Sequence, residues 1–205
     1  FGLGYALNSF SALLEKAEKA GYKKEYLEKA GLVKTTEAGR SFDMFRERVI
    51  FPIHNLSGRV IAFGARQLKK DDKGPKYLNS PESEVYKKSD GLYGIFFAKN
   101  AIRNFDKCYL VEGYTDVITL NQSGIENVVA SSGTSLTPGQ IKQISRFTHN
   151  VTVLYDGDQA GIKASLRGVD LILEAGLQVR IVIFPDGEDP DSYCRKVGGE
   201  EFKNY

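Results

Sequence analysis

The second half of the chain alternates short apolar runs with segments whose apolar residues recur at helical spacing. The apolar runs predict strands at 108–113, 126–133, 150–158 and 178–185. The segments between them predict helices at 115–124, 137–147 and 159–176. Strands that are apolar along their length and alternate with helices are typical of a parallel sheet covered on both faces. The pattern therefore predicts an α/β fold for residues 107–205.

The first half has a mixed pattern. It predicts short helices at 11–22 and 24–32, which stop at Gly21 and Gly31, and a helix after a turn within 89–104. It also predicts strand-like opening residues, a hairpin of strands 48–55 and 59–68, and a polar loop at 69–83. We expect a mixed α+β region over 1–106. Because the strand-like pattern begins at the first residue, we expect a piece of a longer protein.

The composition excludes several classes of protein. No apolar run approaches the roughly 20 residues that span a bilayer, so we expect no membrane partner. The two cysteines, Cys108 and Cys194, are far apart and form no CxxC pair, which suits a reducing cytosol and predicts no zinc site in this chain. With only two histidines, His54 and His149, a histidine-rich metal site is not expected either.

The net charge of +2 conceals a division between the two halves. Residues 1–107 hold 20 Lys and Arg against 13 Asp and Glu, whereas residues 108–205 hold 8 against 13. A basic half joined to an acidic half suits an enzyme that binds a polyanion on one side and divalent cations on the other. Chance clustering of solvated charges is the alternative explanation.

Carboxylates follow three of the predicted strands. Glu112 ends the first strand, Asp156 and Asp158 end the third, and the segment after the fourth contains four more acids: Asp186, Glu188, Asp189 and Asp191. Ligands of open α/β sheets lie beyond the carboxyl ends of the strands. Crowded carboxylates raise one another's pKa unless a cation lies between them. Hard oxygen donors suit Mg²⁺ or Mn²⁺, so the pattern predicts a site for two or more such ions.

Each acidic motif also has an ordinary structural explanation. An Asp-x-Asp after a strand can cap the next helix. The stretch DGEDPD consists of residues that form turns. The expected meeting of all three segments at one sheet edge is what favours a metal site over these explanations.

Several segments carry a family resemblance. VEGYTDVI, ASSGTSLT, LYDGDQAGIKA and PDGEDPDSY resemble the successive motifs of the Toprim domain, and more closely those of the bacterial replicative primases. RERVIFPIHNLSGRVIAFGAR, PKYLNSPES and YKKSDGLYG resemble the basic subdomain of the same family. Topoisomerases share the acidic motifs but not KYLNSPES. Thr115 and Ser132 depart from the family pattern, where an apolar residue and Leu are usual, and neither departure removes a carboxylate.

The resemblance implies a Toprim fold, a four-stranded parallel sheet between helices, for residues 107–205. It implies a mixed α+β basic subdomain of an RNA polymerase core for residues 1–106. It assigns the catalytic metal-binding core to Glu112, Asp156 and Asp158, and a wider metal-binding cluster to Asp116, Asp189 and Asp191. It assigns contacts with template and nucleotide phosphates to Arg48, Arg66, Lys76 and Lys88, with the adjacent Lys87 left open. Tyr77 could stack on a base, and Asn79 either contacts the nucleotide or shapes the turn.

The activity implied by the resemblance is that of a DNA-dependent RNA polymerase, a nucleotidyltransferase that makes short primers on single-stranded DNA. Its substrates are ribonucleoside triphosphates. In the full-length protein, domains outside this chain would contact the replicative helicase and single-strand binding protein. Two alternatives stay open: a Toprim nuclease or topoisomerase fragment, and a non-catalytic module that binds metal together with single-stranded DNA or an alarmone-type nucleotide.

Overall fold

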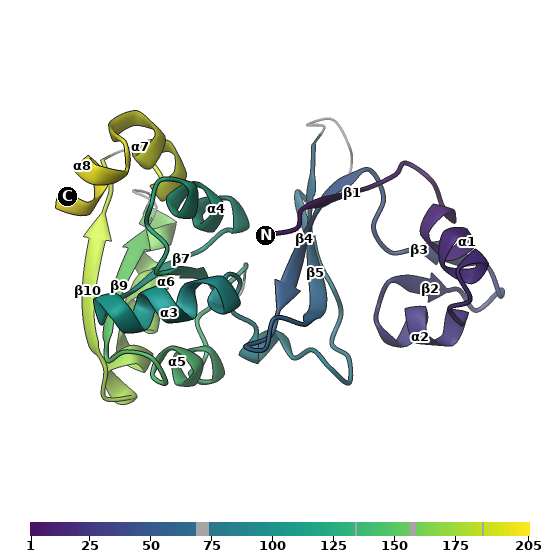
Figure 1. Cartoon of the computed structure of the whole chain (residues 1–205), viewed down its shortest axis with the longest axis horizontal. Helices are drawn as coiled ribbons and strands as arrows, with labels where there is room; N and C mark the ends of the chain where they lie inside the picture. The colour runs from purple at the N-terminus through teal and green to yellow at the C-terminus, as the bar shows by residue number, and fades with distance from the viewer. Residues whose placement is uncertain (69–73, 134, 156–158, 186) are drawn as a thin grey trace. The chain divides into compact units, whose positions relative to one another are not determined.

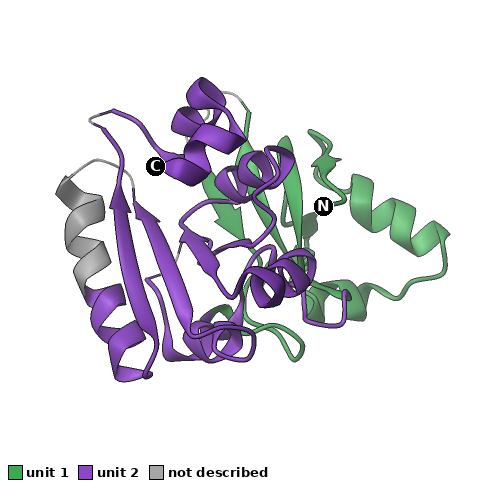
Figure 2. Ribbon diagram, turned by 60° about the vertical axis from the view of Figure 1, so that its left-hand side comes forward, with its two compact units in different colours: residues 1–53, 59–88 green, residues 54–58, 89–205 purple. Residues whose placement is uncertain are grey.

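The computed structural model describes residues 1–68, 74–133, 135–155, 159–185 and 187–205 (Figure 1). These residues form two compact units (Figure 2). Unit 1 consists of residues 1–53 and 59–88, and unit 2 of residues 54–58 and 89–205. The domain division predicted between residues 106 and 107 stays a prediction. No helix among the described residues is long and apolar enough to cross a membrane.

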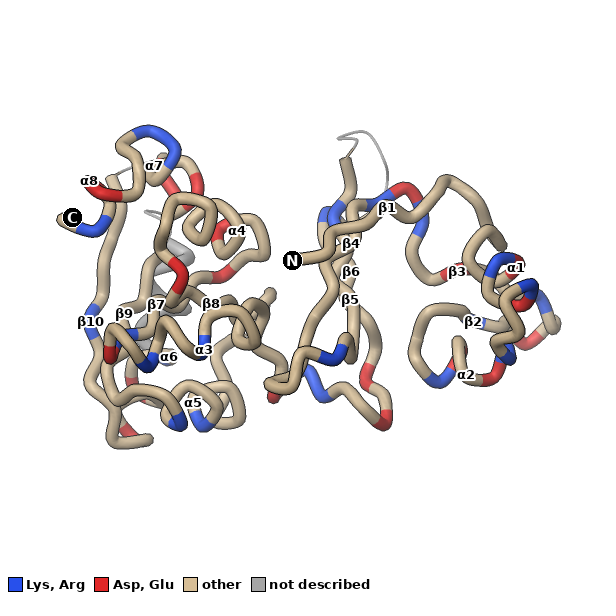
Figure 3. Tube along the Cα trace, in the orientation of Figure 1, with Lys and Arg blue, Asp and Glu red and all other residues tan. Residues whose placement is uncertain are grey.

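Unit 2 is built on one parallel sheet. Its strands are β7 (Cys108–Val111), β8 (Val128–Ala130), β9 (Asn150–Tyr155) and β10 (Gln178–Ile183). They lie in the order β10-β9-β7-β8, and every neighbouring pair is parallel. Figure 3 shows no charged residue along β7, β8 or β9. The predicted parallel sheet is confirmed, and β7, β8 and β9 are largely buried, whereas the edge strand β10 is largely exposed.

The helices of unit 2 cover both faces of this sheet. They are α3 (Ile95–Phe105), α4 (Tyr114–Gln122), α5 (Pro138–Ile144), α6 (Gln159–Glu174), α7 (Pro190–Val197) and α8 (Gly199–Asn204). Helices α3, α5 and α6 share one buried cluster with Cys108 and Leu110 of β7. The chain steps from β7 to β8 in one direction and from β8 to β9 and β10 in the other. Right-handed crossovers therefore place α4 on the opposite face from α5 and α6.

Unit 1 contains a second sheet. Its strands are β1 (Gly4–Ala6), β4 (Arg48–His54), β5 (Val60–Gln67) and β6 (Tyr77–Asn79), in the order β1-β4-β5-β6. Neighbouring strands β4 and β5 are joined by a turn in which the Gly58 N–H donates to the Asn55 carbonyl at 3.0 Å. Gly58 has a φ of +84°, which a residue with a side chain rarely adopts. The predicted hairpin is confirmed.

The prediction of a loop over 69–83 was wrong in part. Strand β6 lies inside that range and pairs antiparallel with β5, Asn79 opposite Gly64 and Tyr77 opposite Arg66. Three residues are too few to show a period in the sequence, and the neighbouring Gly, Pro and Ser residues are typical of loops. The strand exists because the edge of β5 offers backbone partners, a tertiary effect that local propensity does not contain.

The remaining elements of unit 1 form a small lobe. They are α1 (Ala12–Lys19), α2 (Lys24–Lys29), β2 (Val33–Thr35) and β3 (Ser41–Asp43), followed after β6 by a 3₁₀ turn at Lys88–Asp90 that extends into unit 2. Neither α1 nor α2 has a buried residue. The buried Asp43 carboxylate accepts the Leu13 N–H at 2.7 Å and the Leu14 N–H at 3.1 Å, so β3 caps α1 from a distance in sequence.

Candidate active site at the carboxyl edge of the parallel sheet

A pocket of about 250 Å³ lies where β7, β8 and β9 end. It is lined by Leu110, Val111, Glu112, Ser131, Gly133, Ser135, Leu136, Val153, Leu154, Tyr155 and Gly168. The carboxyl edge of an open parallel sheet is where such folds bind ligands. The pocket therefore lies where the sequence predicts the metal site.

Glu112 is an exposed residue that follows the buried strand β7 directly. Its carbonyl accepts the Ser132 N–H at 3.0 Å, which ties the backbone beyond β7 to the backbone beyond β8. Burial raises the pKa of Tyr155 to about 12, and the negative charge of Glu112 contributes to that rise. Tyr155 is the last residue of β9, so Glu112 lies close to the point where Asp156 follows. Asp156 and Asp158 themselves lie outside the described residues, as does Asp186.

Asp116 lies in the first turn of α4 and is 9% exposed. Its Oδ2 accepts the Gly113 N–H at 3.0 Å. A Cβ at Gly113 would come within 2.9 Å of the same oxygen, so glycine allows this close approach. The Asp116 carboxylate therefore holds the backbone immediately after Glu112.

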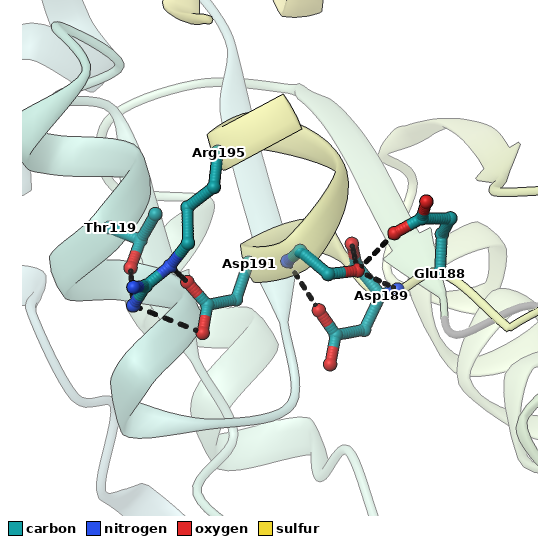
Figure 4. Close-up of polar contacts among 6 residues, drawn as sticks. Thr119, Glu188, Asp189, Asp191 and Arg195 are labelled. Atoms are coloured by element: carbon teal, nitrogen blue, oxygen red, sulfur yellow. Dashed lines mark hydrogen bonds and ion pairs between the residues drawn. The ribbon is translucent and has the colours of Figure 1, made fainter. Parts of the chain in front are cut away.

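Asp189 is the N-cap of α7. Its Oδ1 accepts the Ser192 N–H at 2.6 Å, and its own N–H donates to Ser192 Oγ at 2.9 Å (Figure 4). The Ser192 hydroxyl in turn donates to Glu188 Oε2 at 2.5 Å. Pro190 at the first helical position completes a strong start signal. The predicted acidic stretch is thus a helix start rather than a plain turn. Neither α7 nor α8 was predicted from the sequence.

Asp191 lies one residue inside α7 and forms an ion pair with Arg195. Arg195 Nε lies 2.6 Å from Asp191 Oδ1, and Arg195 Nη2 lies 3.4 Å from Oδ2. The same Nη2 donates to Thr119 Oγ1 of α4 at 3.2 Å. Neither Arg195 nor Thr119 was predicted from the sequence, although an Asp followed four positions later by an Arg is a recognisable helical pair.

The donor chemistry suits a divalent cation. The predicted metal-binding residues are carboxylates without exception, and carboxylate oxygens are the ligands that Mg²⁺ and similar hard ions take. Within the described ranges alone, no group of three or more His, Cys, Asp or Glu side chains could hold a metal ion. Two of the three predicted core ligands, Asp156 and Asp158, fall outside those ranges.

The predicted basic residues lie in unit 1 on and around β6. Arg48 is only 7% exposed, and its Nη1 donates to the carbonyls of Pro75 at 2.8 Å and Lys76 at 3.3 Å. It holds the backbone that leads into β6. Arg66 Cζ and Lys76 Nζ each lie 5.8 Å from the centre of the Tyr77 ring. The three side chains form a cationic and aromatic surface patch, which we call the Tyr77 patch.

Asn79 and Lys88 complete the predicted basic group. Asn79 is half-buried in β6. The Lys88 backbone N–H donates to Glu82 Oε1 at 2.7 Å, and its side chain is half-buried, whereas the neighbouring Lys87 is exposed. Lys87 and Lys88 both stay candidates for the predicted phosphate contact.

Comparisons with known proteins place the chain in a family. Residues 1–99 match the family described as DNA primase catalytic core, N-terminal domain, and residues 109–194 match the family described as Toprim-like. The RNA polymerase domain of Mycobacterium tuberculosis primase DnaG superposes with a TM-score of 0.91 at 33% identity, covering 100% of this chain and 68% of that one. The chain belongs to the DNA primase family. The resemblance to replicative primases, and the Toprim fold that it implies, are confirmed.

Two further primases show how much of a full-length relative the chain spans and which nucleic acid a similar domain binds. The chain is 48% identical over 203 residues to the DNA primase of Clostridium acetobutylicum, over 98% of this chain and 33% of that protein. It therefore spans about a third of the length of this relative. A DnaG primase catalytic domain bound to single-stranded DNA superposes with a TM-score of 0.88 at 42% identity, covering 100% of this chain and 66% of that one. Membership in a Toprim-containing primase family implies use of a divalent metal ion, which the carboxylate donors suit.

Proposed function

We propose that this chain is the catalytic core of a DNA-dependent RNA polymerase that makes short RNA primers on single-stranded DNA. The observation that carries the proposal is the pocket at the sheet edge, where Glu112 lies beside Tyr155, the residue before Asp156, in a chain of the primase family. The relative whose structure contains single-stranded DNA supports the choice of template. Ribonucleoside triphosphates are the corresponding substrates.

In the proposed reaction a primer 3′-hydroxyl attacks the α-phosphate of the incoming ribonucleotide, and pyrophosphate leaves. Glu112, Asp156 and Asp158 would hold two or more Mg²⁺ or Mn²⁺ ions, with Asp116, Asp189 and Asp191 in the wider cluster. Bound ions of this kind lower the pKa of the attacking hydroxyl and neutralise the pyrophosphate. Asp116 fixes the Gly113 backbone and thereby the start of α4 beside Glu112.

The basic residues of unit 1 have a different proposed task. Lys76, Arg66 and Lys88 bind template or nucleotide phosphates, because Arg matches phosphate oxygens with a planar fork and Lys acts as a point charge. Tyr77, between two cations, is suited to stacking on a base. Asn79 lies on the same strand and contacts the nucleotide. Arg48 acts largely through the loop carbonyls that it holds.

We assign residues 1–106 to the basic subdomain and residues 107–205 to the Toprim domain. In the full-length protein, the partners would include the replicative helicase and single-strand binding protein. Bacterial DNA replication takes place in the cytoplasm, and we place the activity there.

The test is incorporation of labelled ribonucleotides on single-stranded DNA with Mn²⁺. The parent chain, Asp156→Asn and Asp170→Asn are compared, the last being the same change at an exposed position of α6. We expect short RNA products from the parent and Asp170→Asn, and none from Asp156→Asn.

A second arm supplies a pre-annealed RNA primer, because a core that does not initiate can still extend. Nucleotide and metal binding without any extension would overturn the proposal in favour of a binding module. Cleavage of the DNA without RNA synthesis would overturn it in favour of a Toprim nuclease.

A further inference from the structure

Arg195 makes a two-point contact with an acidic residue at the sheet edge (Figure 4). Its Nε and Nη2 approach the two oxygens of Asp191, at 2.6 and 3.4 Å. A planar guanidinium that uses two donors fixes the direction of a carboxylate as well as its charge. A lysine at the same position would supply the charge without the fork.

The same guanidinium also reaches another helix. Nη2 donates to Thr119 Oγ1 at 3.2 Å, across 76 positions of sequence. Thr119 is 7% exposed and lies in α4, one turn beyond Asp116, on the helix that starts directly after Glu112 and Gly113. Arg195 therefore connects the segment that carries Asp191 with the segment that follows Glu112.

An ordinary helix-stabilising pair does not account for this arrangement. The Arg195 side chain is 67% exposed, and ion pairs at that exposure contribute little to stability. Asp191 lies in the first turn of α7, where the helix dipole already favours a carboxylate without a neighbouring cation. A pair within one helix also leaves the bond to Thr119 unexplained.

We propose that Arg195 is a positioning residue, which orients the Asp191 carboxylate toward the divalent metal site and fixes α7 against α4 through Thr119. The inference rests on the proposed function, since it takes the carboxylates of the sheet edge as metal-binding. It makes Arg195 part of the support of the site, with no contact of its own to substrate or metal.

The positive charge of Arg195 makes the proposal testable, because a repulsive effect and a positioning effect on metal binding have opposite signs. If Arg195 acted only as a nearby positive charge, its removal would reduce repulsion and tighten metal binding. If it orients Asp191, its removal weakens metal binding, because the partners of metal ligands typically contribute 10- to 100-fold in affinity. The two explanations predict opposite signs for the same measurement.

The measurement is Mn²⁺ binding by isothermal titration calorimetry on the chain as it stands, without nucleotide. Because the guanidinium is exposed, we expect Arg195→Ala to weaken Mn²⁺ binding about tenfold, at the lower end of that range. Arg195→Lys should also weaken it, since the charge stays and the fork is lost. Thr119→Val, which removes only the hydroxyl, should weaken it by a smaller factor.

Lys196→Ala is the matched control. Lys196 is the next residue, its side chain is also 67% exposed, and it pairs with Glu188 rather than with Asp191. We expect its removal to leave Mn²⁺ affinity unchanged or slightly tighter. The thermal midpoint of each variant, measured in parallel without metal, should stay close to that of the parent because the ion pair is exposed.

The outcomes separate this inference from the proposed function. If the parent binds Mn²⁺ and Arg195→Ala binds it equally or more tightly, the positioning role is overturned and the proposed function stands. If Arg195→Lys matches the parent, charge alone suffices and the positioning role is again overturned. If the parent binds no Mn²⁺, the metal site of the proposed function fails and this inference fails with it. If Arg195→Ala does not fold, the Mn²⁺ affinities of Arg195→Lys and Thr119→Val still test the positioning role.

Discussion

In unit 2 the candidate core residues Glu112 and Asp156 directly follow β7 and β9, strands that are largely buried. In unit 1 the candidate cations Arg48, Arg66 and Lys76 lie on β4, on β5 and just before the three-residue edge strand β6. Glu112 is one residue beyond Val111, which is 2% exposed, and Asp156 directly follows Tyr155, which is 7% exposed. Lys76 is exposed, and the backbone beside it is held by the side chain of Arg48.

The difference corresponds to what each kind of contact requires. A metal site needs its ligands placed to within about 0.5 Å, and a packed parallel sheet supplies that rigidity. Contacts to a phosphate backbone depend mainly on charge and tolerate adjustment of long side chains. We infer that unit 2 contributes fixed geometry to the proposed reaction and that unit 1 contributes an adaptable surface.

The largest expected change in stability contrasts the buried core of unit 2 with the exposed helix α1 of unit 1. Ile102 of α3 is 0% exposed within the main core cluster, whereas Leu13 of α1 is 40% exposed. Ile102→Ala should cost about 3 kcal/mol of unfolding free energy through lost burial and a residual cavity. Leu13→Ala should cost less than about 1 kcal/mol. Urea denaturation followed by circular dichroism measures both, and equal losses would contradict the contrast.

A smaller effect is expected where unit 1 depends on a polar contact instead of burial. Asp43→Asn keeps the shape of the side chain but removes one of the two acceptors for the Leu13 and Leu14 N–H groups. We expect a loss of about 1 to 2 kcal/mol, as for other helix caps. Hydrogen exchange of these two amides should accelerate while that of β9 stays unchanged. Unchanged exchange at Leu13 and Leu14 would show that the cap contributes nothing to α1.

The smallest effect concerns the Tyr77 patch. Lys76→Ala should reduce the slope of log affinity for single-stranded DNA against log salt by about 0.7, the value for one phosphate contact on a single strand. The control is Lys142→Ala, an exposed lysine of α5 in unit 2. Fluorescence anisotropy at several salt concentrations measures both slopes. Equal slopes for the parent and Lys76→Ala would remove Lys76 from the proposed phosphate contacts.

The parallel sheet could be predicted from the sequence because each of its strands is a nearly continuous apolar run. The edge where Glu112 lies followed from that prediction, since parallel strands end at one side. Strand β6 and the helices α7 and α8 were not predicted. Strand β6 depends on the edge of β5. Helix α7 has a start signal in Asp189 and Pro190, but the same stretch also has the composition of a turn, and the turn was the interpretation made.

The supporting contacts of the site were harder to predict than the candidate ligands. The ligand types could be named because hard metal ions take carboxylates. The Arg195 contact with Thr119 depends on how helices pack, whereas the Asp116 contact with Gly113 is a local capping contact at the start of α4. The cap that Asp43 provides to α1 joins residues about 30 positions apart, beyond the reach of a local pattern. The excess of basic residues in the first half and of acidic residues in the second predicted two regions of different function. It could not predict that Arg48 is buried against loop carbonyls.

The central claim is that the carboxyl edge of the parallel sheet holds the metal-dependent chemistry, and one pair of variants tests it most directly. Glu112→Gln removes a charge at that edge, and Glu126→Gln makes the same change at an exposed residue just before β8, at the opposite edge. Incorporation of ribonucleotides on primed single-stranded DNA with Mn²⁺ is measured beside the thermal midpoint. We predict that Glu126→Gln matches the parent and that Glu112→Gln loses about 1,000-fold or more without loss of fold. Incorporation by well-folded Glu112→Gln at the level of the parent would contradict the account.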